Sequence, residues 1–335
     1  MKNKIIIGTR TSKLALYQAH KVADELKKNF PNQEIKFKEV KTKGDILLNQ
    51  SLNRQLDKGF FVKEIQELLL SNEIDIAVHS MKDLPVEDVK SLTISAVLER
   101  ANPQDVFLSN KNKELKYFNK NEIIGTTSLR RKAQLLKLNS KLNIKDIRGN
   151  VDTRIKKMID GKYDGLVMAA AGIERLNLKN HITEYLSLDF FLNAPGQGAI
   201  AVEINENNIK IHEMVSKINH KKTMICTRSE RNFMKKMGGG CNYPIGSYSY
   251  IMDNVLTLEG IILSLDGKKS IRHKVQTKNH DDNLPQILAD KFETDNIKQL
   301  IKEIDDVMAA KNNKIKNIEA IISPPGIAPK AIGRV

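Results

Sequence analysis

Arginines occur in this sequence at places where they could bind an anion. Residues 8–13, 125–131 and 146–154 each combine arginine with hydroxyl or amide side chains, and each is expected to join a strand to a helix. Free N–H groups at a helix N-terminus stabilise anions, and arginine forks bind carboxylates bidentately. Arg154 falls in the first turns of its helix, where acidic residues are favoured, so it indicates a nearby anion. For residues 125–131 the alternative is an ordinary N-capped helix with solvated arginines.

One aspartate accompanies these arginines. The segment His79-Ser-Met-Lys-Asp-Leu-Pro85 reads as a strand that continues directly into Lys82 and Asp83. A single carboxylate at the mouth of a basic cleft is suited to acid–base work or to stabilising a developing cation. The alternative is a Lys–Asp pair on the surface, and we expect His79 to be structural.

The two cysteines have different surroundings. Cys241 follows three glycines after a predicted helix, where a thiol can reach a ligand, whereas Cys226 lies beside apolar residues and is expected in a core. Two cysteines cannot build a disulfide framework, so we expect free thiols in a reducing compartment. The sequence contains no CxxC or HExxH pattern, and we expect no metal site.

Alternating strand-like and helix-like segments must position these residues. Through the first two-thirds of the chain this alternation predicts mainly parallel sheets covered by helices, including helices over residues 129–138 and 151–159. After about residue 220, a helix over 223–237 precedes alternating segments that are typical of a small antiparallel α+β unit. A further helix is expected near 297–308. Residues 311–335, with three prolines, are expected to be a weakly ordered tail.

Charge supports an anionic partner. The 335 residues carry a formal net charge of +15, and residues 126–175 contribute 12 − 5 = +7 of it. No apolar run approaches the ~20 residues that span a bilayer, so we expect no membrane partner and a cytoplasmic location. The absence of Trp and the 5% aromatic content weaken a nucleic-acid reading.

Taken in order, the motifs resemble one family. The chain is similar to porphobilinogen deaminases through residues 4–310, and eight segments carry the resemblance: Gly8-Thr-Arg-Thr-Ser12, Lys43-Gly-Asp45, residues 57–64, residues 75–87, Gly125-Thr-Thr-Ser-Leu-Arg-Arg131, Arg148-Gly-Asn-Val-Asp-Thr-Arg154, Ala194-Pro-Gly-Gln-Gly198 and the Gly-Gly-Cys-x-x-Pro-Ile-Gly segment around Cys241. The sequence departs from the family pattern at Lys13 and in the loop 53–60.

The resemblance implies an α/β fold with two lobes like those of periplasmic binding proteins, each with a mainly parallel mixed sheet, and a small α+β C-terminal domain. Domain 1 would comprise residues 1–98 and 195–218, domain 2 residues 99–194, and the third domain residues 219–310. The tail 311–335 has no role implied by the resemblance.

The resemblance also implies the activity. The family condenses four porphobilinogens head to tail, with release of ammonia, into the linear tetrapyrrole hydroxymethylbilane. Chain growth begins on a dipyrromethane cofactor, which is held by a thioether to the loop cysteine. We expect a monomer with this polycarboxylate substrate and no nucleic-acid partner. The rival hypotheses are a non-catalytic anion-binding module with two lobes and, well behind it, a nucleic-acid binder.

Site residues are carried over by position. Asp83 matches the catalytic carboxylate of the family, and Cys241 matches the covalent anchor. The residues that match cofactor contacts are Lys82, Thr127, Ser128, Arg130, Arg131 and Arg154. The residues that match substrate contacts are Arg10, Ser12, Thr126, Arg148 and Arg175.

Overall fold

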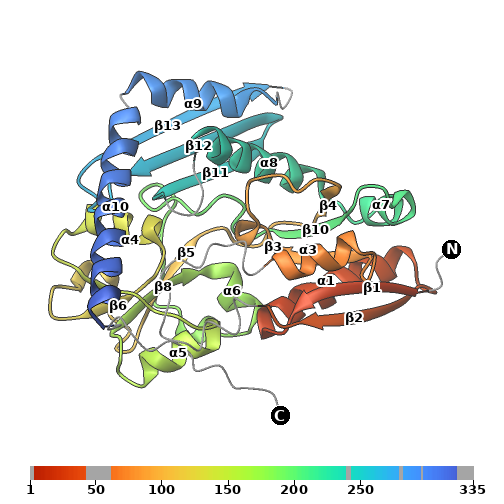
Figure 1. Ribbon diagram of the computed structural model, residues 1–335, viewed down its shortest axis with the longest axis horizontal. Coiled ribbons are helices and arrows are strands. Elements are labelled where there is room, and N and C mark those ends of the chain that lie inside the picture. Colours follow the sequence, from red (N-terminus) through yellow and green to blue (C-terminus); the bar gives the residue numbers. More distant parts are fainter. Residues whose placement is uncertain (1–3, 43–61, 239–242, 279–281, 296, 323–335) are drawn as a thin grey trace, which may run out of the picture.

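The computed structural model describes residues 4–42, 62–238, 243–278, 282–295 and 297–322, with side chains described as far as residue 310. Two five-stranded sheets and one three-stranded sheet organise these residues. In Figure 1 the first five-stranded sheet lies at the right, the second at the lower left and the three-stranded sheet at the top. We call the parts built on the two larger sheets the first and second lobes.

The first lobe has the strand order β2-β1-β3-β10-β4. Its strands are β1 (Lys4–Arg10), β2 (Glu34–Val40), β3 (Ile76–Ser80), β4 (Leu92–Val97) and β10 (Ile200–Asn205). Helices α1 (Lys13–Asn29) and α3 (Lys63–Leu70) cover opposite faces of the sheet, and α7 (Ile209–Ser216) follows β10. Alternation along β1 explains this arrangement, because Ile5 and Ile7 pack in one core with α1 while Ile6 packs with α3.

The second lobe repeats this plan with the order β7-β6-β8-β5-β9. Its strands are β5 (Asp105–Ser109), β6 (Ile123–Gly125), β7 (Asn143–Lys145), β8 (Gly165–Ala169) and β9 (Glu184–Tyr185). Its helices are α4 (Leu129–Leu138), α5 (Val151–Ile159) and α6 (Ala170–Arg175). The bounds predicted for α4 and α5 are confirmed.

The two larger sheets are mixed, as expected, and half of their strand pairings are parallel. β1 pairs in parallel with β2 and β3, and β6 with β7 and β8, but β10 and β5 run antiparallel to their neighbours. The reason lies in the path of the chain. The parallel strands end at the edge facing the other lobe, whereas β5 and β10 arrive from that lobe and begin there. Ile200, at the start of β10, accordingly pairs with Ser80 at the end of β3.

The C-terminal part is the expected small α+β unit. β11 (Ile245–Met252), β12 (Val255–Leu263) and β13 (Ser270–Lys278) form an antiparallel sheet. The helices α8 (Lys221–Lys236) and α9 (Leu284–Thr294) cover it. Phe233 and Phe292 meet between them, with ring centroids 5.3 Å apart.

The expectation of a weakly ordered tail from residue 311 is wrong for its first twelve positions, because α10 runs from Ile297 to Ile322. Ile297, Leu300 and Ile304 recur at helical spacing and are buried against the C-terminal core, which fixes the start of this helix. No glycine or proline follows until Pro324, so nothing in the sequence interrupts it. Among the described residues, no helix has both the length and the apolar character needed to cross a membrane.

Candidate active site

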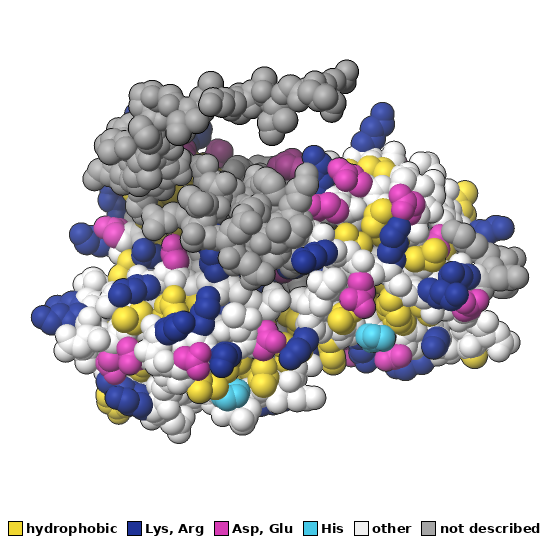
Figure 2. Space-filling view, turned by 60° about the horizontal axis from the view of Figure 1, so that its bottom comes forward, with side chains coloured by type: hydrophobic (Ala, Val, Ile, Leu, Met, Phe, Trp, Pro, Cys, Tyr) yellow, Lys and Arg dark blue, Asp and Glu magenta, His cyan; other side chains and the backbone are white. Residues whose placement is uncertain are grey.

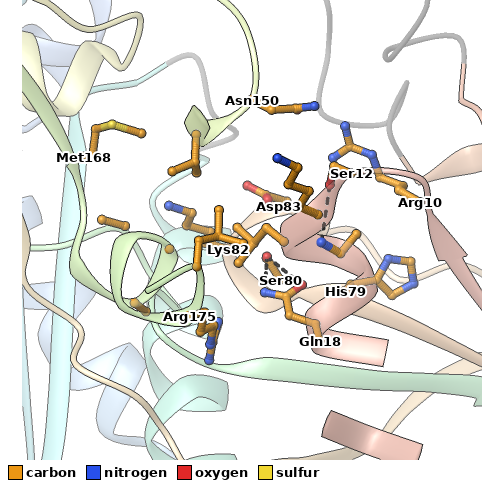
Figure 3. Close-up of a pocket in the computed structure, with 18 of the residues that line it drawn as sticks. Arg10, Ser12, Gln18, His79, Ser80, Lys82, Asp83, Asn150, Met168 and Arg175 are labelled. Atoms are coloured by element: carbon orange, nitrogen blue, oxygen red, sulfur yellow. Dashed lines mark hydrogen bonds between the residues drawn. The ribbon is translucent and has the colours of Figure 1, made fainter. Parts of the chain in front are cut away.

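A pocket of about 300 Å³ lies where the two lobes meet. Its walls come from the ends of β1, β3 and β8 and from the starts of α1, α5 and α6. Figure 3 shows Lys82 and Asp83 between Arg10 on one side and Arg175 on the other. The pocket thus lies at the carboxyl ends of parallel strands, and two lobes build it.

The lining of this pocket is strongly basic. Six of its side chains are basic and two are acidic. The basic residues are Arg10, Lys13, Lys82, Arg131, Arg154 and Arg175, and the acidic residues are Asp83 and Asp152. On the face shown in Figure 2, by contrast, Lys and Arg side chains are interspersed with Asp and Glu. Positive charge is thus concentrated where the pocket can enclose a carboxylate-rich ligand.

The candidate catalytic residue lies in a tight turn after β3. The turn starts with Met81 and is flanked by Ser80 and Leu84. The residues from Met81 to Asp83 form a short 3-10 helix, η2, directly after β3. Asp83 lines the pocket, and within the described residues its carboxylate accepts no hydrogen bond and joins no ion pair. A carboxylate in a pocket whose lone pairs accept no hydrogen bond from the protein can accept one from a ligand.

Lys82 has an unusual environment in the same turn. Its Nζ donates to Gln197 Oε1 at 3.3 Å. Burial, together with the nearby charge of Arg131, lowers the pKa of Lys82 to about 7, although Asp83 acts in the opposite direction. A carboxylate of a ligand placed beside Lys82 would therefore stabilise the charged form of this side chain and raise its pKa.

Arg131 reaches the pocket from α4 and is oriented by Asp105. Its Nε and Nη2 donate to Asp105 Oδ1 at 3.0 and 2.7 Å, and Arg130 Nη1 donates to Asp105 Oδ2 at 2.7 Å. Burial acts to raise the pKa of Asp105, but the two arginines outweigh it and hold that pKa below its ordinary value. The sequence reasoning missed Asp105, which stands at the start of a buried strand and belongs to no motif.

The neighbours of Arg131 in its motif hydrogen-bond to other parts of the protein. They are absent from the pocket lining in the described part of the chain. Arg130 also donates to the carbonyl of Leu192 at 2.6 Å, and Ser128 accepts the N–H of Arg131 at 3.4 Å as the N-cap of α4. Thr127 Oγ1 accepts the N–H of Ile147 at 3.2 Å, and the buried Thr126 accepts the N–H of Ser128 at 3.3 Å. Of the three hydroxyls, only that of Ser128 caps α4.

Of the remaining arginines predicted for the site, some line the pocket and one, within the described residues, does not. Arg154 and Arg175 line the pocket, and each donates to one backbone carbonyl, Arg154 Nε to Gly149 and Arg175 Nη2 to Gly198, both at 2.7 Å. Burial and Arg131 lower the pKa of Arg154 to about 10, and burial lowers that of Arg175. Arg148 is not among the described residues that line the pocket. Ser12 lines it while its Oγ caps α1, 3.3 Å from the N–H of Ala15.

The two cysteines and His79 complete the comparison. Cys226 is buried in the C-terminal core, and burial raises the pKa of its thiol to about 11. Cys241 and the loop 53–60 lie outside the described residues. His79 lines the pocket and also forms a buried contact with Glu203, 3.2 Å from Nε2 to Oε2. No cluster of three potential metal ligands occurs among the described residues.

Comparisons with known proteins identify the family. Residues 5–213 match the family model described as porphobilinogen deaminase, dipyromethane cofactor binding domain, and residues 224–294 match porphobilinogen deaminase, C-terminal domain. The porphobilinogen deaminase of Thermus thermophilus is 44% identical over 273 residues, which are 81% of this chain and 89% of that protein. The porphobilinogen deaminase of Syntrophomonas wolfei is 46% identical over 263 residues, covering 78% and 86%.

Among solved structures, the VFT2 domain of BvgS from Bordetella pertussis is similar with a TM-score of 0.40 and 13% identity, over 65% of this chain and 87% of that chain. The assignment rests on the sequence matches, which cover both lobes and the C-terminal unit. The chain belongs to the porphobilinogen deaminase family.

Proposed function

We propose that this chain condenses four porphobilinogen molecules head to tail into hydroxymethylbilane with release of ammonia, and that Asp83 carries the chemistry. The observation that carries this proposal is a pocket with six basic side chains in which the carboxylate of Asp83 joins no hydrogen bond or ion pair within the described residues. Each porphobilinogen brings two carboxylates, so the basic residues match the substrate in charge. The negative charge of Asp83 matches the cationic character of the reaction.

The pocket residues suit separate tasks. Arg10, Arg131, Arg154 and Arg175 bind and orient carboxylates, and each charge-assisted hydrogen bond contributes about 1.5–3 kcal/mol. Asp83 stabilises positive charge on the reacting pyrrole and accepts the ring proton at its carboxylate oxygen. Because Asp105 accepts two hydrogen bonds from Arg131, the guanidinium is held in one orientation before the ligand binds.

The donor set also fits dipyrromethane, which carries four carboxylates. When bound through a thioether to Cys241, this group supplies the primer on which the chain grows. Lys82, Arg131 and Arg154 are the residues of the pocket that we assign to its carboxylates. Arg130, Thr126, Thr127 and Ser128 support the turn that presents Arg131. The assignments of Thr127, Ser128 and Arg130 to the cofactor, and of Thr126 and Arg148 to the substrate, stay predictions.

We also propose the domain boundaries 1–98 with 195–218, 99–194 and 219–310. In support, β10 belongs to the first sheet although it follows the whole second lobe. A monomer is consistent with a pocket whose two walls come from one chain. We propose a cytoplasmic location because Cys226 is a free thiol.

Intact-protein mass spectrometry, with turnover of porphobilinogen measured in parallel, tests the function. We expect the purified chain to carry an excess mass of two pyrrole units, which Cys241→Ser removes and the control Cys226→Ala retains. A fully active protein without this mass would refute the cofactor assignment. A protein that binds porphobilinogen but releases no ammonia would instead be a non-catalytic binding module.

A further inference from the structure

The turn that presents Asp83 is held from behind by the C-terminal unit. Lys82 and Asp83 line the active-site pocket, whereas Met81, Leu84 and Pro85 line a separate groove on the other side of the turn. This rear groove also contains Arg231, which belongs to α8. The turn therefore forms a wall that separates the pocket from the rear groove.

Arg231 hydrogen-bonds to the backbone of this wall. Its Nη2 donates to the carbonyl of Pro85 at 2.7 Å, and its Nη1 donates to the carbonyl of Leu84 at 3.1 Å and to that of Met81 at 3.5 Å. Two of these carbonyls flank Lys82 and Asp83 in sequence. A guanidinium with its planar array of donors can serve several carbonyls at once, which an ammonium on a flexible stem does less well.

The other supports of the turn come from the first lobe. The N–H of Met81 donates to the carbonyl of Ala199 at 3.0 Å. Gly196 lies so close that a Cβ built on it would be 2.4 Å from Met81 Cγ. These contacts fix the start of the turn. Arg231 fixes its end, so the position of the Asp83 carboxylate depends on both.

The helix that supplies Arg231 also leads to the anchor cysteine. α8 ends at Lys236, and Cys241 follows five residues later in the sequence. Phe233, two residues beyond Arg231, is completely buried in the C-terminal core, so this part of α8 is firmly seated. Arg231 thus joins the helix that precedes the proposed anchor cysteine in sequence to the turn that carries Asp83.

We propose that Arg231 is a positioning residue, which holds the Asp83 turn in register with the helix that precedes Cys241. The inference rests on the proposed function and deepens it. Since Arg231 faces the rear groove and touches backbone carbonyls, it acts on the placement of Asp83 and leaves the carboxylate-binding side chains of the pocket in place. Its loss should lower kcat, while KM and cofactor content stay near their original values.

The test replaces Arg231 by methionine, which keeps an unbranched side chain and removes the donors. We expect kcat to fall about 10- to 100-fold, because small displacements of a reacting group cost this much. KM should stay within about twofold, since substrate binding is unchanged. Intact mass should still show two pyrrole units. Arg231→Lys, which keeps the charge and some donors, should recover part of kcat.

Lys235→Met is the matched control. Lys235 lies one turn further along α8 and pairs with Asp88 at 2.7 Å, but both side chains are largely exposed. We expect its kcat to be unchanged. The inference is overturned if Arg231→Met matches Lys235→Met in kcat, or if its cofactor mass is lost along with kcat. If Arg231→Met does not fold, Arg231→Lys decides by the same criteria: a lower kcat at unchanged KM supports the inference, and an unchanged kcat overturns it.

The unaltered chain is assayed beside the variants. Absence of turnover by the unaltered chain overturns the proposed function and this inference together. Turnover by the unaltered chain that Arg231→Met equals overturns this inference alone.

Discussion

Asp105 holds Arg131 by two hydrogen bonds to a single carboxylate oxygen, at 3.0 Å from Nε and 2.7 Å from Nη2. Asp105 is completely buried and Arg131 is nearly so, yet Arg131 reaches the pocket. The geometry leaves Asp105 behind the pocket wall. It therefore compensates the buried arginine charge without competing for the space of a ligand.

Asp105→Asn should lower the free energy of unfolding by about 3 kcal/mol or more, because it leaves two buried guanidiniums without a countercharge. Denaturant unfolding at neutral pH measures this. Asp88→Asn removes an exposed ion pair with Lys235 and is the control, with an expected change of about 0–1 kcal/mol. Equal effects of the two substitutions would contradict the role given to Asp105. The pKa of Asp105 is lowered in the folded protein, so this carboxylate contributes to the free energy of unfolding at neutral pH. The contribution is lost only as pH falls below the ordinary pKa of an aspartate.

Asp83→Asn should keep the cofactor mass and substrate binding while turnover falls by about 100-fold or more, since the amide can neither accept the ring proton nor balance positive charge. Steady-state assays of ammonia release measure the loss. Asp152→Asn is the control, because Asp152 is the other acidic residue of the pocket and is paired with Lys13 at 3.3 Å near the surface. Near-normal turnover of Asp83→Asn would refute its catalytic role. A similar loss in both variants would indicate a general effect of charge.

Lys82 should give stability a dependence on pH above 7. The unfolded chain keeps the proton of this lysine up to its ordinary pKa of 10.5, whereas the folded chain releases it above a pKa of about 7. Between these values the unfolded state binds more protons, so the free energy of unfolding rises with pH. Below pH 7 both states are protonated and this contribution is constant.

Comparing Cys241→Ser with the double variant that also carries Lys82→Met isolates the effect, since neither protein can attach the cofactor. We expect the Cys241→Ser protein to gain stability relative to the double variant as pH rises from 7 to about 9. Denaturant unfolding at several pH values measures this difference. A difference that stays constant over that range would show that Lys82 keeps its ordinary pKa.

Gly196→Ala should destabilise the protein by about 1–3 kcal/mol, because the residue has a left-handed φ of +71° and its new Cβ would meet Met81 at 2.4 Å. Gly161→Ala is matched to it, with φ of +75° and nothing within 4 Å of the new Cβ. The difference between the two variants, measured by thermal or denaturant unfolding, reports the packing beneath the Asp83 turn. Equal losses would mean that backbone conformation accounts for the whole effect.

Much of the secondary structure could be predicted from periodicity. The helices over residues 129–138 and 151–159 begin and end where expected, because apolar spacing and capping residues are local signals. The basic pocket and the place of Asp83 in it could also be predicted, because the carboxyl ends of parallel strands meet at one edge of a sheet. The antiparallel strands β5 and β10 were missed because sequence order does not reveal from which lobe a strand enters its sheet.

The sequence alone placed arginines and one aspartate at strand-to-helix turns and thereby indicated an anionic ligand. Only the tertiary structure distinguished the members of each motif. Successive residues of a helix point about 100° apart, so Arg131 faces the pocket while Arg130 turns to Leu192. Asp105 and Arg231 carry no motif because each acts through residues distant in sequence. Their roles exist only once folding brings the two lobes and the C-terminal unit together.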